Sequence, residues 1–140
     1  MRSVLETNSI IWDPFTKKNI LMLEKINKRF LKYLYFKQNV IYPNDIEYEF
    51  LLQHFNIKSF KERRAIATLK ELYKILNFHI DCPDLLCKLS LNSGLANTRN
   101  QDLFYLNVPR VNVCANSPLF RAMKLYNLNN KSLDLNTGQL

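Results

Sequence analysis

The stretch from Lys17 to Phe36 constrains the fold of this 140-residue chain more than any other part of its sequence. Its apolar residues recur at steps of three and four, which is the spacing of one face of an α-helix. This face comprises Ile20, Leu23, Ile26, Phe30 and Leu34, and it is widened by Leu31 and Tyr33. The pattern predicts a long amphipathic helix with this face in the core and with Thr16 as its N-cap.

The opposite face of the predicted helix is basic. Between Pro14 and Lys37 the chain holds seven Lys or Arg residues and one acid, Glu24. Ordinary solvated helix faces mix Glu with Lys, whereas a face of nearly one sign is typical of a surface that follows nucleic-acid phosphates. The candidate nucleic-acid-binding residues, which include two on a later helix, are Lys18, Lys25, Lys28, Arg29, Lys32, Tyr35, Arg63 and Lys70.

Aromatic residues interleave with these cations. We expect Phe30 and Tyr33 to lie in the core, because aromatic residues at helical spacing usually pack inside. Tyr35 and Phe36 lie nearer the basic side of the helix. They are therefore the better candidates for stacking on nucleic-acid bases.

The remaining sequence favours a mainly α fold of about five helices. A second helix is expected over residues 45–55, with Asn44 as its cap. The third is expected over residues 59–77, where Ser59 and Glu62 have the spacing of a capping box. Two shorter helices are expected over 83–88 and 118–127, and residues 103–114 form at most one short β-hairpin.

The order of several short motifs resembles one region of a known enzyme family. In the first part of the chain the matching residues are Arg2, Ser3, Leu5, Glu6, Trp12, Pro14, Phe15, Leu23, Glu24, Lys25, Arg29 and Phe30. Further along they are Glu62-Arg63-Arg64, Leu72-Tyr73-Lys74-Ile75-Leu76, Ile80-Asp81-Cys82-Pro83, Pro109-Arg110 and Ser117-Pro118-Leu119-Phe120-Arg121. Together they are similar to the segment after the polymerase palm in reverse transcriptases of non-LTR, jockey-like (LINE-type) retrotransposons. Thr7 and Asn27-Lys28 depart from that family's usual residues.

The resemblance implies a helical thumb-like region over residues 1–80 and a small helical or irregular tail over 81–128 packed on it. Residues 129–140 are expected to be disordered. The resemblance also implies that the chain is a fragment of an RNA-directed DNA polymerase from a transposable element. Such a fragment is expected to bind RNA or DNA template–primer without regard to sequence. The missing palm region of the polymerase is a second partner that the resemblance implies.

Catalysis in such polymerases depends on two metal ions held by palm carboxylates, which include an Asp-Asp turn. No two of the six aspartates in this chain are adjacent. We therefore expect no polymerase chemistry from the chain on its own, no catalytic residue and no cofactor.

The composition is compatible with a polyanion partner, because the chain has a net charge of +8 and a pI near 9.5. No apolar run approaches the roughly twenty residues that a bilayer span needs. We expect no membrane partner and an intracellular location, in the nucleus or the cytoplasm.

A zinc site is one alternative for His79, Cys82, Cys87 and Cys114. Their spacing departs from the usual Cys-x2-Cys opening of zinc motifs, and the leucines around Cys87 suggest burial. We therefore favour core thiols and expect no metal site.

The sequence leaves open two alternatives to a nucleic-acid-binding polymerase segment. The chain could be a basic protein-interaction module that reuses the same surface. It could also be a non-functional remnant whose core is partly open, because the palm that should cover it is missing.

Overall fold

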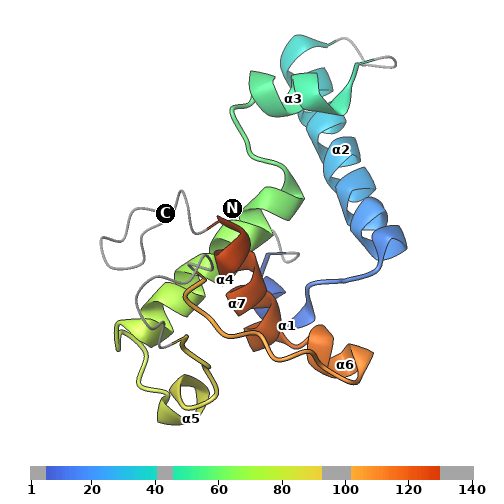
Figure 1. Cartoon of the computed structure of the whole chain (residues 1–140). Helices are drawn as coiled ribbons and strands as arrows, with labels where there is room; N and C mark the ends of the chain where they lie inside the picture. Colours follow the sequence, from blue (N-terminus) through green and yellow to red (C-terminus); the bar gives the residue numbers. More distant parts are fainter. Residues whose placement is uncertain (1–5, 41–45, 93–101, 130–140) are drawn as a thin grey trace. The chain divides into compact units, whose positions relative to one another are not determined.

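The computed structural model describes residues 6–40, 46–92 and 102–129, and these are mainly helical, as expected (Figure 1). The helices in these ranges are α1 (Ser9–Trp12), α2 (Lys17–Asn39), α3 (Tyr48–His54), α4 (Phe60–Leu76), α5 (Pro83–Leu86), α6 (Asn112–Ala115) and α7 (Pro118–Asn129). The five expected helices correspond to α2, α3, α4, α5 and α7, whereas α1 and α6 are short additions. The expected cap Asn44 lies outside the described residues, and so do residues 130–140 of the segment 129–140 that was expected to be disordered. Asn129 itself is the last residue of α7.

One of the two expected helix caps forms its capping hydrogen bond. Thr16 occupies the N-cap of α2 in an extended conformation, but its side chain makes no capping hydrogen bond. Ser59 does cap α4, since its hydroxyl accepts a hydrogen bond of 3.2 Å from the backbone N–H of Glu62.

The described residues between 103 and 114 form no β-hairpin, which agrees with the expectation of at most one. Within the described residues the only strand-like pairing is an isolated antiparallel bridge between Leu91 and Phe104, and residues 112–115 are helical. A tertiary contact explains the absence of a hairpin. The side-chain amide of Asn127 accepts from the Phe104 N–H at 3.2 Å and donates to the Phe104 carbonyl at 2.8 Å. These bonds satisfy the backbone groups that a hairpin partner would otherwise have paired.

The chain divides into two compact units, and the division runs through α4. One unit comprises residues 12–64, and the other comprises residues 1–11 together with 65–140. The resemblance implied a different boundary, near residue 80, which stays a prediction.

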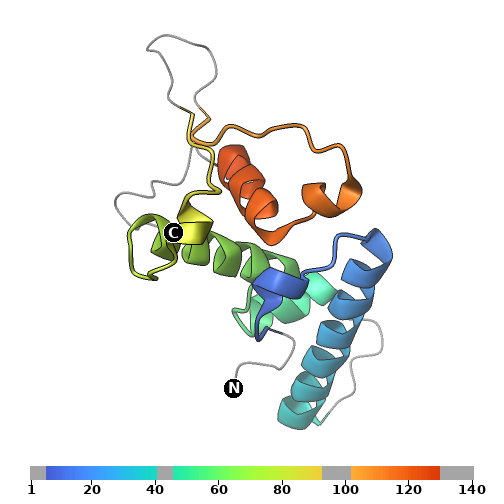
Figure 2. The ribbon, with the colours of Figure 1, turned by 90° about the horizontal axis from the view of Figure 1, so that it is seen from below.

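In the larger unit, α7 packs alongside α4 (Figure 2). Their contact contains most of the core, and the residues of the loops around Leu89 and Phe104 complete it. The buried residues of this core are Leu69, Leu72, Ile75, Leu89, Phe104, Ala122, Met123 and Tyr126. Residues 9–11 of the short helix α1 belong to the same unit, and Arg121 on α7 donates a hydrogen bond of 3.0 Å to the carbonyl of Ile10.

The smaller unit consists of α2, α3 and the first turn of α4. Each contributes one side chain that is almost fully buried: Leu31, Leu51 and Phe60. Arg64 is also buried here. Its guanidinium forms an ion pair with Asp13 and lies over the ring of Phe60, 5.1 Å from the centroid.

Candidate nucleic-acid interface

The candidate interface on α2 depends on the inward orientation of Glu24, the single acid of that helix. The Tyr48 hydroxyl donates to Oε2 of Glu24 at 2.6 Å, and the backbone N–H of Lys61 donates to Oε1 at 2.8 Å. Asn27 donates to the same hydroxyl at 2.7 Å. Lys61 lies in the first turn of α4, where unpaired N–H groups and the helix dipole favour a carboxylate. Glu24 therefore connects α2 to both α3 and α4.

This network decides which side of α2 is packed. Asn27 and Leu31 are the buried residues of α2, so the helix turns its Glu24 side toward the rest of the unit. The expected core positions of Ile26, Phe30 and Tyr33 are wrong, since these side chains are 48%, 56% and 54% exposed. The sequence pattern failed because the true inner side contains polar residues that find partners only in the folded unit.

The side chains of Lys18, Lys25 and Arg29 are exposed, and we call these three the basic row. Steps of seven and four residues place them on one side of the helix. Among the residues that the structure describes, no carboxylate pairs with any member of the row. Since Glu24 faces inward, α2 presents these cations to solvent without an acid of its own.

The other predicted site residues have varied surroundings. Lys28 and Lys32 are half-buried on α2. Tyr35 is also half-buried, and its ring contacts His54 edge-on with centroids 5.3 Å apart. The structure therefore places six of the eight predicted residues on α2. Of these six, only the three residues of the basic row are exposed, and they lie on one side of the helix.

The two predicted residues of α4 fall in different units. The guanidinium of Arg63 lies over the Phe60 ring, 5.2 Å from its centroid, in the unit that contains α2. Lys70 is exposed in the larger unit. The participation of Lys70 in a surface shared with α2 stays a prediction.

Sequence reasoning missed a set of exposed residues beside the basic row. We call Met22, Ile26, Phe30 and Tyr33 the exposed apolar row. Steps of four, four and three residues align them along α2. One signal was present in the sequence, because Glu24, Asn27 and Leu31 have the spacing of an alternative inner face.

The cysteines give no sign of a metal centre. Cys87 and Cys114 are exposed and Cys82 is half-buried, so the expected burial of Cys87 is wrong. Within residues 6–40, 46–92 and 102–129, no group of three or more His, Cys, Asp or Glu side chains is placed to hold a metal ion.

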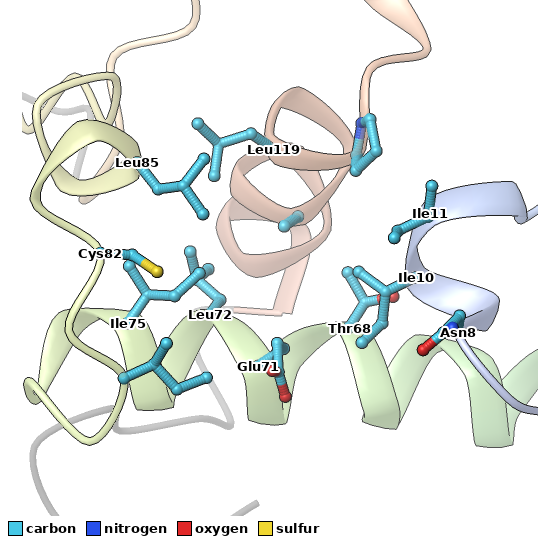
Figure 3. Close-up of a pocket in the computed structure, with 13 residues that line it drawn as sticks. Asn8, Ile10, Ile11, Thr68, Glu71, Leu72, Ile75, Cys82, Leu85 and Leu119 are labelled. Carbon is cyan, nitrogen blue, oxygen red and sulfur yellow. The ribbon is translucent and has the colours of Figure 1, made fainter.

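A second candidate site is an apolar cavity of about 470 Å³ in the larger unit (Figure 3). The side chains of α4 and α7 face each other across it, and residues of α1 and α5 close its ends. Its labelled lining residues are Asn8, Ile10, Ile11, Thr68, Glu71, Leu72, Ile75, Cys82, Leu85 and Leu119. The Glu71 carboxylate is paired with Lys74 at 3.1 Å. The lining contains no histidine, and most of its residues are apolar.

In comparisons with known proteins, no family model, no curated protein and no solved structure matches this chain. The comparisons therefore assign this chain to no family. The resemblance to retrotransposon reverse transcriptases therefore stays a prediction from the sequence. No helix in the described part of the chain is both long enough and apolar enough to cross a bilayer.

The Tyr48 hydroxyl makes the stability of the fold depend on pH in a way that can be tested. Burial, and then donation to Glu24, raises the pKa of Tyr48 to about 12. Because the unfolded value is about 10, the neutral hydroxyl stabilises the fold below about pH 10, and this contribution is lost as the pH rises toward about 12. We expect urea unfolding to show a larger loss of stability between about pH 9 and about pH 11 for the wild type than for Tyr48→Phe. Equal losses in the two proteins would contradict the assignment.

Proposed function

We propose that this chain binds nucleic acid through the basic row of α2. In this proposal it is the thumb-and-tail part of a non-LTR retrotransposon RNA-directed DNA polymerase, downstream of the catalytic palm. It holds template–primer by its phosphates and contributes no polymerase chemistry of its own. An intracellular location, in the nucleus or the cytoplasm, belongs to the same proposal.

The observation that carries the binding proposal is the inward orientation of Glu24. A helix with basic and acidic residues on its outer side would repel phosphates in part, whereas α2 keeps its only acid in hydrogen bonds to Tyr48 and Lys61. Each exposed cation can then displace condensed counterions from a nucleic-acid backbone. The family assignment is supported by the sequence motifs alone.

The test is a salt titration of binding to an RNA–DNA hybrid and to duplex DNA. We compare the wild type with the triple variant Lys18→Gln, Lys25→Gln, Arg29→Gln. The slope of log K against log salt is expected to fall by about 2–3, since each lost phosphate contact removes about 0.9. Binding should weaken equally for all sequences, because phosphate contacts carry no sequence information.

The chain offers a matched control with the same change in charge. Lys88, Arg110 and Lys124 are exposed residues of the larger unit, so their triple change to Gln also removes two Lys and one Arg. We expect this control to keep the wild-type salt slope within about 1. Equal slopes for the two triple variants would show that general charge, and not the basic row, governs binding.

The exposed apolar row supports a second candidate function, a basic module that binds a protein. Four large apolar side chains in a line on one helix exceed the scattered exposure that is normal on a soluble surface. In the proposed polymerase, the palm region is one such partner.

A further inference from the structure

The exposed apolar row and the basic row run side by side along α2. Tyr33 follows Arg29 by four residues, and Arg29 follows Lys25 by four, so these three side chains are aligned along the helix. Phe30 lies beside them, one three-residue step from Tyr33. Tyr33 is therefore bordered by Arg29, Phe30 lies next to Tyr33, and neither ring has an acid three or four residues away on α2.

We propose that Phe30 and Tyr33 form a stacking platform for the bases of single-stranded RNA or DNA whose phosphates follow Lys25 and Arg29. This inference rests on the proposed function, and it names single strands as the class of nucleic acid bound at the same site. Base–aromatic stacking is tolerant of sequence, because every base has a π-face.

The exposure of the two rings supports this occupant. More than half of each side chain is exposed, and no ring of another described residue lies against either of them. Tyr35, the stacking candidate from the sequence, already has its ring against His54. Base stacking requires a free ring face, so Phe30 and Tyr33 meet a requirement that Tyr35 does not.

The chemistry of stacking favours a single strand over a duplex. The bases of a duplex are paired and stacked on each other, so their faces are closed to the rings of Phe30 and Tyr33. Unpaired bases of a single strand can lie against aromatic side chains.

A protein partner fits this face less well. It would have to supply apolar groups for Met22 and Ile26 and acids for Lys25 and Arg29. A single-stranded nucleic acid provides both complements in each nucleotide, with an anionic phosphate next to an aromatic base.

The experiment measures affinity by fluorescence anisotropy for three probes of equal length and charge per strand. The probes are a pyrimidine single strand, an abasic sugar–phosphate strand and a duplex. The double variant Phe30→Leu, Tyr33→Leu keeps the apolar character and all charges but removes the stacking faces. We expect it to bind the single strand about tenfold or more weakly, and to bind the abasic strand and the duplex as the wild type does.

A matched control is available in the larger unit, where Phe78 and Tyr105 are 75% and 59% exposed. The double variant Phe78→Leu, Tyr105→Leu should bind all three probes like the wild type. Circular dichroism checks that both variants keep the helix content of the wild type.

The outcomes separate this inference from the proposed function. If Phe30→Leu, Tyr33→Leu binds the single strand as tightly as the wild type, the stacking platform is wrong while phosphate binding stands. If the wild type binds none of the probes, the proposed function is wrong as well. Self-association of the wild type that persists in the leucine variant and excludes the probes would assign the face to protein contacts and overturn the inference.

Discussion

Replacing Glu24 with alanine is expected to lower the free energy of unfolding of the unit formed by residues 12–64 by about 2–4 kcal/mol. The carboxylate accepts hydrogen bonds from the Tyr48 hydroxyl and from the backbone N–H of Lys61. Hydrogen bonds to a charged group contribute about 1.5–3 kcal/mol each, and two that share one carboxylate are not additive. The variant also leaves Tyr48 without its acceptor.

Urea unfolding followed by circular dichroism measures this loss. Glu49→Ala is the matched control, because Glu49 is an exposed residue of the same unit and its removal changes the charge equally. We expect the control to lose less than about 1 kcal/mol, the contribution of an exposed acid in the first turn of a helix. Similar losses in the two variants would mean that Glu24 does not organise the unit.

The variant Glu24→Ala also distinguishes a structural role of Glu24 from a direct electrostatic effect of its charge on nucleic-acid binding. Glu24→Ala makes α2 more positive, so a purely electrostatic change would strengthen binding to nucleic acid. If Glu24 acts by holding α2 against α3 and α4, binding should be retained at low urea and lost at a lower urea concentration than in the wild type. Anisotropy measured across a urea series tests both expectations.

The second large effect is expected for Asp13→Asn, at about 2–4 kcal/mol of unfolding free energy. Arg64 is buried with its side chain 3% exposed, and Asp13 is its ion-pair partner at 31% exposure. Removing one partner of a buried pair leaves a charge that is neither hydrated nor compensated, which typically costs about 3–5 kcal/mol. Because Asp13 is partly exposed, water can replace some of its contribution, so we expect a somewhat smaller loss, of about 2–4 kcal/mol.

Trp12, the only tryptophan of the chain, is adjacent to Asp13 and provides a local fluorescence signal for unfolding. Asp81→Asn makes the same chemical change at an exposed residue and serves as the control. We expect this control to shift the urea midpoint very little, in line with surface substitutions of about 0.5 kcal/mol or less. A wild-type midpoint for Asp13→Asn would exclude the ion pair as a stabilising contact.

Local sequence signals predicted the helices well. The three- and four-residue spacing in α2, the Ser59 cap of α4 and the Pro83 start of α5 all depend on neighbours within one or two turns. Such signals act on the chain before any tertiary contact forms, so they can be read in one dimension. Their limit is visible at Phe104, whose backbone is bound by the side chain of Asn127, 23 residues away in sequence.

By itself, the sequence determined the mainly helical fold and the excess of cations on α2. Only the tertiary structure decided which side of α2 is exposed. Burial of Asn27 beside Leu31 becomes favourable once Tyr48 and the first turn of α4 supply partners for Asn27 and Glu24. A buried polar group is costly unless it is hydrogen-bonded, and these partners lie 21 to 37 residues away in sequence. The same contacts turn Phe30 and Tyr33 outward beside the basic row, where the sequence had placed the core.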